Sequence, residues 1–206
     1  MHNALTVKSK KIIPNLQRLT GFYLAGGTGL ALQIGHRISV DFDLFCRKKI
    51  PANLLQEVEK AFSDHEVKIS VNNPDELTVF IDGIKVTFLY YPFPVYSEFT
   101  EIEGLKILLP KEIGYTKAYS IGRRGSYKDY VDLYFLLKDK IIALEDIVKE
   151  CSKIYGDRFS DRLFLEQLVY MDDVDEIEIK FINSEISKKD IETYFADEVR
   201  KFGKTI

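Results

Sequence analysis

The sequence predicts an α+β protein: a mixed sheet with flanking helices, followed by a C-terminal helical bundle. Short apolar and aromatic runs alternate with helical periodicity as far as Pro110. The pair Asp82-Gly83 separates two apolar runs as a β-hairpin turn does, and the pattern after Lys111 is helical. We therefore expect an α/β domain at residues 1–110 and a helical domain at 111–206, packed against it around a cleft.

The expected elements of the first domain alternate between helix and strand. A helix over 4–19, with Pro14 as a break or a start, precedes a strand at 22–26 and a glycine-rich turn. The helix after this turn ends at Gly35, and a strand follows at 37–45. The later elements are a helix at 52–65, strands at 66–72 and on both sides of Asp82-Gly83, and a strand or turn at 102–110.

The second domain is expected to contain only helices, at 111–121, 127–139, 143–155, 159–170 and 187–202. Two of these have the spacing of a capping box at their start, in which a serine and the third residue after it bond to each other's backbone. The pairs are Ser126 with Asp129, and Ser187 with Asp190.

Composition excludes several classes of protein. The 206 residues are 46% hydrophobic and carry a formal net charge of −3, so a nucleic-acid contact would need a local basic patch. The two cysteines, Cys46 and Cys151, form no CxxC pair, so neither a disulfide framework nor a zinc site is expected. The sequence shows no signal peptide, and no apolar run approaches the ~20 residues that span a bilayer. We expect a cytoplasmic protein without a membrane partner.

Two carboxylates share one face of the strand at 37–45. Side chains alternate along a strand, which directs the apolar residues to the core and the polar ones to the other face. The expected core set is Ile38, Val40, Phe42 and Leu44, and the polar set is Arg37, Ser39, Asp41 and Asp43. Neighbouring acids repel each other, and a magnesium ion relieves the repulsion. For an isolated pair of this kind, a solvated strand face is the commoner explanation.

A glycine-rich turn lies just upstream of the acidic pair. Gly26 and Gly27 allow a close approach of the backbone, and the N-terminus of the next helix attracts phosphate. Thr28 can cap that helix or donate to a phosphate oxygen. The spacing of a dinucleotide-binding motif is absent, because its third glycine is missing. A phosphate seat beside a metal-binding pair is the chemistry of nucleotidyl transfer, in which metal ions bridge the triphosphate and stabilise the leaving pyrophosphate.

The stretch "GGTGLALQIGHRISVDFDLF" resembles the nucleotidyltransferase superfamily, and in particular the AbiEii/AbiGii family of bacterial toxins. The later stretch "PKEIGYTKAYSIGRRGSYKDYVDLYFLL" is similar to the second conserved block of that family. The resemblance covers roughly residues 20–140. It implies a polymerase-β-like sheet, an NTP substrate, Mg²⁺ as cofactor and an antitoxin encoded by a separate gene. Some members of the family transfer nucleotides to the 3′ end of tRNA.

The resemblance also implies roles for particular residues. Gly27 and Thr28 would hold the triphosphate, and Asp41 and Asp43 would bind Mg²⁺. Lys117 would contact the nucleotide phosphates, and Asp129 would be a base or a substrate-orienting acid. A cationic wall near the nucleotide or an RNA acceptor would consist of Arg123, Arg124 and Lys128. We add Gly26, in the same turn, and Ser39, on the polar strand face, to the predicted nucleotide-binding residues.

Several residues keep a second interpretation. Asp129 also suits the first turn of a helix as an acid that bonds to backbone N–H groups, and Lys117 alone would be a solvated lysine. Asp132 is expected to pair with Arg124 or Lys128. Many relatives in the superfamily carry a third carboxylate on a later strand, where this chain has Thr87.

The sequence thus predicts a Mg²⁺-dependent nucleotidyltransferase that modifies RNA, most plausibly a tRNA 3′ end, and acts as a toxin. Two alternatives stay open at this point. One is a catalytically weak module that binds nucleotide, RNA or an antitoxin, which Thr87 favours. The other is transfer to a small cationic acceptor such as an aminoglycoside.

Overall fold

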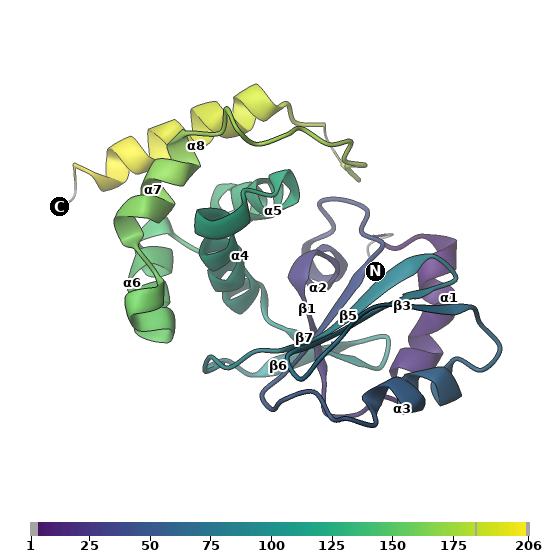
Figure 1. Ribbon diagram of the computed structural model, residues 1–206. Helices are drawn as coiled ribbons and strands as arrows, with labels where there is room; N and C mark the ends of the chain where they lie inside the picture. The colour runs from purple at the N-terminus through teal and green to yellow at the C-terminus, as the bar shows by residue number, and fades with distance from the viewer. Residues whose placement is uncertain (1–3, 184, 205–206) are drawn as a thin grey trace. The chain divides into compact units, whose positions relative to one another are not determined.

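The computed structural model describes residues 4–183 and 185–204, and it does not describe the side chain of Arg124. The chain forms two compact units, Met1–Leu109 and Pro110–Ile206. In the described residues the first unit contains a seven-stranded mixed sheet with helices, and the second is helical (Figure 1). The α+β fold is therefore confirmed, whereas packing of one unit against the other stays a prediction.

The first unit alternates helices and strands much as expected. Its helices are α1 (Val7–Leu16), α2 (Gly26–Ile34) and α3 (Leu54–Ala61). Its strands are β1 (Tyr23–Ala25), β2 (Phe42–Cys46), β3 (Val67–Asn72), β4 (Glu76–Ile81), β5 (Ile84–Tyr90), β6 (Phe99–Ile102) and β7 (Leu105–Leu108). Pro14 lies inside α1 and neither starts nor breaks it. Gly35 ends α2 in the left-handed conformation, with φ of 64°, as predicted.

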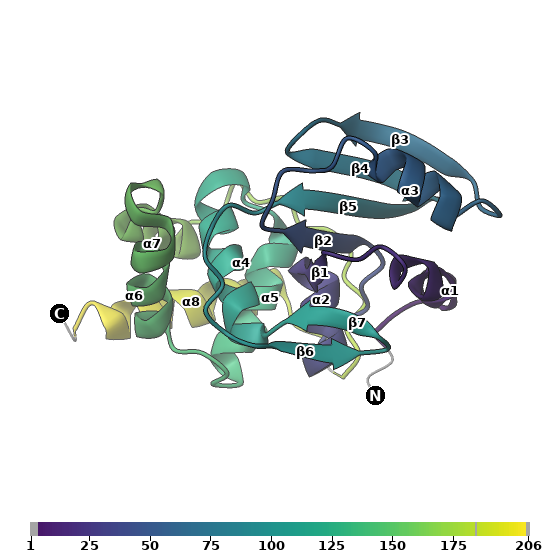
Figure 2. The same ribbon diagram turned by 90° about the horizontal axis from the view of Figure 1, so that it is seen from below.

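The strands form one sheet in the order β3-β4-β5-β2-β1-β7-β6, which Figure 2 shows edge to edge. The central strand β2 runs antiparallel to β1 and parallel to β5. The turn from β1 into α2 therefore lies next to β2, and α2 packs on both strands. This arrangement brings the glycine-rich turn and the acidic strand together.

One face of the sheet carries the hydrophobic core of the first unit. Helices α1 and α3 supply Ile12, Leu16, Leu54 and Val58 to a cluster that includes buried side chains from the strands. Phe42 and Leu44 of β2 belong to it, with 0% and 4% of their surface exposed. Asp43 lies between them in sequence, so it points to the opposite face of the sheet.

The strand predicted at 37–45 begins only at Phe42. In the preceding segment the burial pattern is the reverse of the expected one: Arg37 and Ser39 are buried, and Val40 is 41% exposed. The reason is a contact with the chain before α1. The Ser39 N–H donates to the Ala4 carbonyl at 2.8 Å. This single β-bridge sets which side chains of the segment turn inward.

The hairpin between β4 and β5 is confirmed at Asp82-Gly83, where both residues have positive φ. Asp82 is structural there, because its carboxylate contacts His65 Nδ1 at 2.7 Å and accepts from the Glu66 N–H at 3.0 Å. The stretch 102–110 contributes to a second hairpin, β6–β7.

The second unit contains the predicted helices with small shifts in their ends. They are α4 (Pro110–Arg124), α5 (Tyr127–Lys138), α6 (Leu144–Tyr155), the 3₁₀ turn η1 (Gly156–Arg158), α7 (Asp161–Val169) and α8 (Lys188–Phe202). The capping box of Ser187 and Asp190 is confirmed. That of Ser126 and Asp129 is wrong, since the Ser126 side chain makes no capping bond and the Asp129 carboxylate binds a lysine instead.

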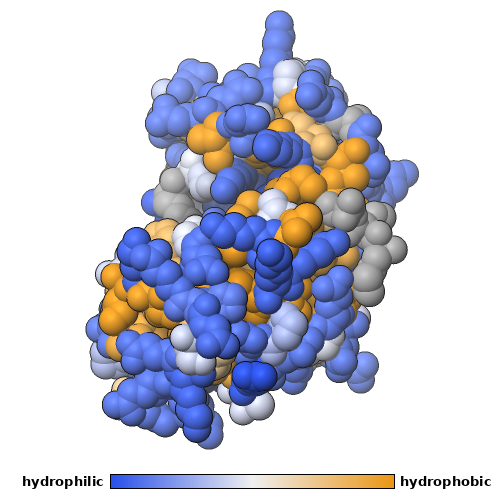
Figure 3. All heavy atoms as spheres, turned by 90° about the vertical axis from the view of Figure 1, so that its right-hand side faces the viewer, coloured by the Kyte–Doolittle hydropathy of each residue, from blue (hydrophilic) through white to orange (hydrophobic). Residues whose placement is uncertain are grey.

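Hydrophilic side chains cover much of the face drawn in Figure 3, with apolar side chains scattered among them. Such scattered apolar residues are normal for a folded protein in water. Within the described residues, no helix has the length and apolar character needed to cross a membrane.

Candidate functional site

Asp43 lies directly beside the start of α2. Its backbone pairs with Ala25 across the antiparallel β1–β2 ladder, and Gly26 follows as the first residue of the helix. Gly26 has φ of +59°, and a Cβ atom built on it would lie 3.0 Å from Asp43 Cγ and overlap the carboxylate. The absence of a side chain at Gly26 is therefore what lets the acid reach the helix N-terminus.

Thr28 ties the first turn of α2 to the segment that leads into β2. Its hydroxyl is hydrogen-bonded to the Ser39 hydroxyl at 2.8 Å and donates to the main-chain oxygen of Asp41. Thr28 is only 1% exposed. The structure thus brings Thr28, Ser39 and Asp41 together through a buried contact. Their proposed roles toward a nucleotide stay predictions.

The neighbour of Asp43 on the other side is Thr87. The parallel β2–β5 ladder aligns Asp43 with Thr87, and the β5–β4 ladder aligns Thr87 with Thr78. Residues in register on neighbouring strands present their side chains on the same face. The sequence therefore pointed to the right position for a third acid, and the residue there is a threonine.

The two acids predicted to bind Mg²⁺ lie in the first unit, at Asp41 and Asp43. Mg²⁺ prefers oxygen ligands and is commonly bound by one or two carboxylates together with phosphates of the substrate. Asp41 and Asp43 supply the carboxylates, and the start of α2 can receive the phosphates. Among the described residues, no group of three or more His, Cys, Asp or Glu side chains could hold a metal ion alone. The remaining ligands would be neutral oxygens, water and phosphate.

Electrostatics favour a cation between Asp43 and a phosphate bound at the start of α2. The Asp43 carboxylate and a bound triphosphate would both be attracted to the positive end of α2, and they would repel each other there. A divalent cation between them turns this repulsion into two attractions. The contact between Asp43 and Gly26 thus favours metal-assisted binding over simple phosphate binding.

The second unit contains a buried cluster around Lys117. The Lys117 ammonium lies 2.7 Å from Asp129 Oδ1 and 2.8 Å from Asp132 Oδ2. At most 8% of any of these three side chains is exposed. Helix α4 supplies the lysine, and α5 supplies both acids from one face, three residues apart. The structure therefore brings Lys117 and Asp129 together, as two members of one ion cluster.

Asp132 is the member of this cluster that sequence reasoning assigned elsewhere. It was expected to pair with Arg124 or Lys128; its fully buried carboxylate binds Lys117, and pairing with Arg124 stays a prediction because that side chain lies outside the described part of the chain. The spacing of Asp129 and Asp132 could have indicated this ion cluster. It places both acids on one helix face, and two acids on a buried face require a shared cation. Which lysine supplies it depends on how α4 packs against α5.

The predicted cationic wall is only partly described. Arg123 is exposed, lies over the Tyr119 ring at 4.2 Å and donates to the Arg158 carbonyl at 3.0 Å. Arg123 and Arg158 both line a cavity of about 240 Å³ between α4 and the start of α7. Lys128 is exposed on α5, and the side chain of Arg124 lies outside the part of the chain that the structure describes.

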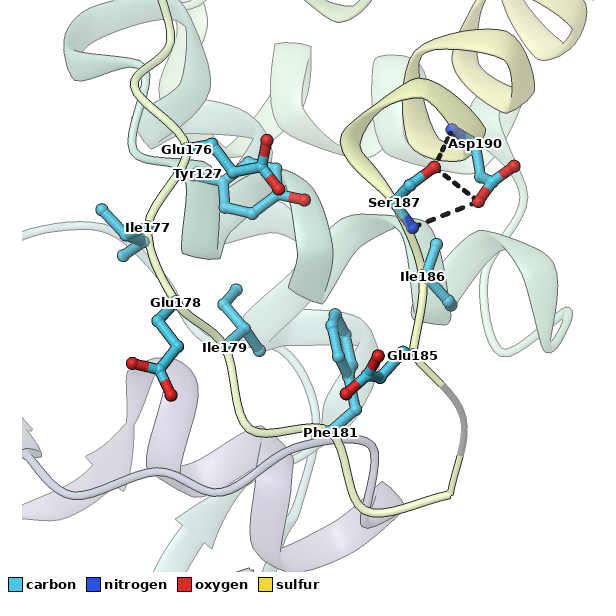
Figure 4. A pocket seen from close by; sticks show the side chains of 10 residues that line it. All are labelled: Tyr127, Glu176, Ile177, Glu178, Ile179, Phe181, Glu185, Ile186, Ser187 and Asp190. Atoms are coloured by element: carbon cyan, nitrogen blue, oxygen red, sulfur yellow. Dashed lines mark hydrogen bonds between the residues drawn. The ribbon is translucent and has the colours of Figure 1, made fainter.

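A larger cavity of about 550 Å³ has acidic walls (Figure 4). Glu176, Glu178 and Glu185 line it, together with Tyr127 and the capping pair of α8. Burial, followed by the charge of Glu176, raises the pKa of Tyr127 to about 12, so this phenol stays protonated at neutral pH. The negative charge of the cavity disfavours a phosphate-bearing ligand there.

The chain matches a described protein family and is similar to a bacterial protein. Residues 13–205 match the model of a family described as "Nucleotidyl transferase AbiEii toxin, Type IV TA system". An uncharacterised protein of Aquifex aeolicus (strain VF5) is 32% identical over 185 residues, which cover 89% of this chain and 84% of the relative.

Solved structures show the same fold. A crystal structure of an H. pylori protein, described as a candidate nucleotidyltransferase, is similar with a TM-score of 0.62 and 23% identity, over 96% of this chain and 93% of that one. MenT4, a nucleotidyltransferase toxin of Mycobacterium tuberculosis H37Rv, is similar with a TM-score of 0.60 and 17% identity, over 86% of this chain and 74% of that one.

The family match extends over nearly the whole chain, and it includes the glycine-rich turn, Asp41, Asp43 and the Lys117 cluster. The fold, with its acidic strand beside a helix that begins with glycine, agrees with that match. The chain therefore belongs to the AbiEii family of nucleotidyltransferase toxins and is a nucleotidyltransferase enzyme.

Proposed function

We propose that this enzyme transfers a nucleotidyl group from a Mg²⁺-bound NTP to the 3′ hydroxyl of an RNA, most plausibly a tRNA, and thereby acts as a toxin. The observation that carries the proposal is the contact between the Asp43 carboxylate and Gly26 at the start of α2. It supports a site in which a metal ion joins the acids to the phosphates of the nucleotide.

Each residue of the first unit has a role in this proposal. Asp41 and Asp43 would hold the metal ion, which when bound stabilises the charge that develops on the phosphates. Gly26 and Gly27 would let the triphosphate approach the N–H groups at the start of α2. Thr28 and Ser39 would hold the two parts of the site in place through their hydrogen bond.

Lys117 and Asp129 keep the roles that the family resemblance implies, as a phosphate contact and a substrate-orienting acid. Their mutual ion pair gives each a structural role as well. Activity measurements on variants of these residues therefore need a parallel measurement of stability, so that a loss of folding is not taken for a loss of chemistry.

The direct test uses purified protein, labelled NTPs, total tRNA and Mg²⁺. We expect label transfer by the wild type, and a loss of transfer by Asp41→Asn and by Asp43→Asn. The matched control is Asp64→Asn, because Asp64 is an exposed acid just beyond α3. Removal of the metal with EDTA should stop the reaction, and added Mg²⁺ should restore it.

The acceptor is tested with periodate-treated tRNA, which has lost its 3′ hydroxyl. We expect no label on this RNA. Label that persists there, or transfer by Asp43→Asn at the wild-type rate, would contradict the proposal. Label recovered on a small cationic molecule such as an aminoglycoside, and not on RNA, would assign a different acceptor.

The toxin role predicts that expression of the wild type arrests growth and that expression of Asp43→Asn does not. We further propose that a separately encoded antitoxin prevents the arrest. Co-expression of candidate genes from the same neighbourhood tests this, with growth as the readout. Arrest of equal strength by Asp43→Asn would show that toxicity does not depend on transfer.

A further inference from the structure

A row of oxygen-bearing side chains approaches Asp43 across the sheet. Asp43 on β2 is in register with Thr87 on β5, and Thr87 is in register with Thr78 on β4. Neighbouring strands lie about 4.8 Å apart, and residues in register face the same side. Both threonines are nearly buried, with 8% of Thr87 and 2% of Thr78 exposed.

A carboxylate stands at the far end of this row. The Thr78 hydroxyl is hydrogen-bonded to Glu76 Oε1 at 2.6 Å and to the Thr87 hydroxyl at 3.2 Å. Glu76 begins β4 and is half-buried. The three side chains are thus joined by two hydrogen bonds on the face of the sheet that carries Asp43.

The chemistry of these groups sets the direction of the bonds. A threonine hydroxyl has one proton to donate and two lone pairs, and an ionised carboxylate can only accept. The Thr78 proton is therefore directed to Glu76. Thr78 is also the donor in the longer contact with Thr87 Oγ1, so Thr87 accepts there and keeps its second lone pair for a partner elsewhere.

A neutral hydroxyl oxygen with a lone pair available is a suitable ligand for magnesium. The phosphate-binding loops of many NTPases use a Ser or Thr hydroxyl on Mg²⁺ in this way. Thr87 occupies the position next to Asp43, and Asp41 and Asp43 alone give the metal two protein carboxylates. A third oxygen at this place would help to complete the coordination of the ion.

We propose that Thr87 Oγ1 is the third protein oxygen of the metal site, and that Glu76, acting through Thr78, is a positioning residue that orients it. This inference rests on the proposed function, because it assumes that Asp41 and Asp43 hold the metal. It assigns a role to Glu76, a residue of the sheet that the sequence motifs do not include.

The proposal has a consequence for the charge of the site. Two carboxylates and one hydroxyl carry a charge of −2, which one Mg²⁺ neutralises, whereas three carboxylates would leave an excess negative charge before the nucleotide arrives. The threonine therefore weakens binding of the metal alone but reduces repulsion of the triphosphate.

The test measures binding of Mn²⁺ alone by calorimetry, with folding checked by thermal unfolding. We expect Thr87→Val, which keeps the shape and removes the oxygen, to weaken Mn²⁺ binding about tenfold, as loss of a supporting polar group at a metal site commonly does. Thr87→Ser should keep wild-type affinity, and Thr87→Asp should bind Mn²⁺ more tightly. Thr100→Val, at a half-buried threonine on β6, is the matched control.

The role of Glu76 is tested by a double-mutant cycle. Glu76→Gln should weaken Mn²⁺ binding in the wild-type background and have no further effect in the Thr87→Val background, because Glu76 acts through the Thr87 hydroxyl. Equal effects of Glu76→Gln in both backgrounds would contradict its positioning role. Wild-type affinity of a folded Thr87→Val protein would overturn the whole inference.

The same titrations separate this inference from the proposed function. If Asp41→Asn and Asp43→Asn bind Mn²⁺ as tightly as the wild type, the proposed metal site itself is wrong. If those variants lose the metal while Thr87→Val keeps it, the metal site stands and only the role of Thr87 is wrong.

Discussion

The carboxylate of Asp43 occupies the space that a side chain on Gly26 would need, since a Cβ atom there would lie 3.0 Å from Asp43 Cγ. Gly26 is the first residue of α2 and Asp43 lies in β2, and the β1–β2 ladder, which pairs Ala25 with Asp43, holds them together. Two things disfavour any other residue at position 26. Its φ of +59° is a left-handed conformation, and a Cβ atom there would overlap the Asp43 carboxylate.

Gly26→Ala should therefore displace the Asp43 carboxylate and impair metal binding as well as stability. The left-handed conformation alone costs about 1–2 kcal/mol for a residue with a Cβ atom, and the overlap adds to this cost. The measurements are the free energy of unfolding in urea and the affinity for Mn²⁺.

The matched control is Gly21→Ala. Gly21 has φ of +89°, but a Cβ atom there would meet nothing within 4 Å. We expect Gly21→Ala to lose stability through backbone strain alone and to bind Mn²⁺ normally. Equal metal affinity of the Gly26 and Gly21 variants would show that Asp43 does not need the space at Gly26.

Lys117→Met should destabilise the protein by about 3–5 kcal/mol, because it removes a cation that two buried carboxylates share. Asp129 and Asp132 both bind the Lys117 ammonium, and Asp132 is fully buried. Urea unfolding at pH 7 gives the value. Lys128→Met, at an exposed lysine of the neighbouring helix, should change stability little. A Lys117→Met protein of wild-type stability would mean that the buried pairs do not form.

Thr28→Val should lower the free energy of unfolding by about 1–3 kcal/mol, the usual cost of leaving a buried hydrogen-bond partner unsatisfied. The hydroxyl joins Ser39 and the Asp41 carbonyl, so the variant should also weaken Mn²⁺ binding by loosening the Asp41 backbone. Thr28→Ser retains the hydroxyl and should behave as the wild type. If both variants unfold alike, the hydroxyl does not stabilise this junction.

Acid should remove a contribution that Asp82 makes to stability. Hydrogen bonds from His65 and from the Glu66 N–H lower the pKa of Asp82 below its ordinary value. A carboxyl whose pKa is lowered on folding adds stability above its unfolded pKa of about 3.9, and this contribution is lost as the pH falls through the folded value. Asp82→Asn should therefore have a shallower dependence of the unfolding midpoint on pH between about 2 and 5.

An unchanged pH dependence of Asp82→Asn would contradict the assigned hairpin contact. The variant leaves Asp43, Thr87 and Glu76 in place, so nucleotidyl transfer at pH 7 should continue. This separates a structural acid from the acids of the proposed site.

Local patterns predicted much of the fold. The Asp82-Gly83 hairpin and the end of α2 at Gly35 follow from residues that favour positive φ, and such preferences act over a few residues. Helix ends in the second unit shifted by one to three residues, because the last turn of a helix depends on its caps more than on its periodicity.

Features set by distant contacts were not predictable in the same way. Ser39 is buried because its backbone pairs with Ala4, and alternation alone placed it on the polar face. Asp132 binds Lys117 because α4 packs against α5, and the sequence also offered Arg124 and Lys128, which are nearer to Asp132 along the chain. The position of Thr87 beside Asp43 was anticipated, but the link from Thr87 through Thr78 to Glu76 needed the register of three strands.

The contact of α2 with Asp41 and Asp43 is made within residues 23–46, one short and nearly local segment of the chain. Closing so short a loop costs little conformational entropy, so this part can assemble early in folding. During synthesis the helix and the acids can meet before the C-terminal half of the chain has been made. The Thr87 row, which lies more than forty residues further along, must join later.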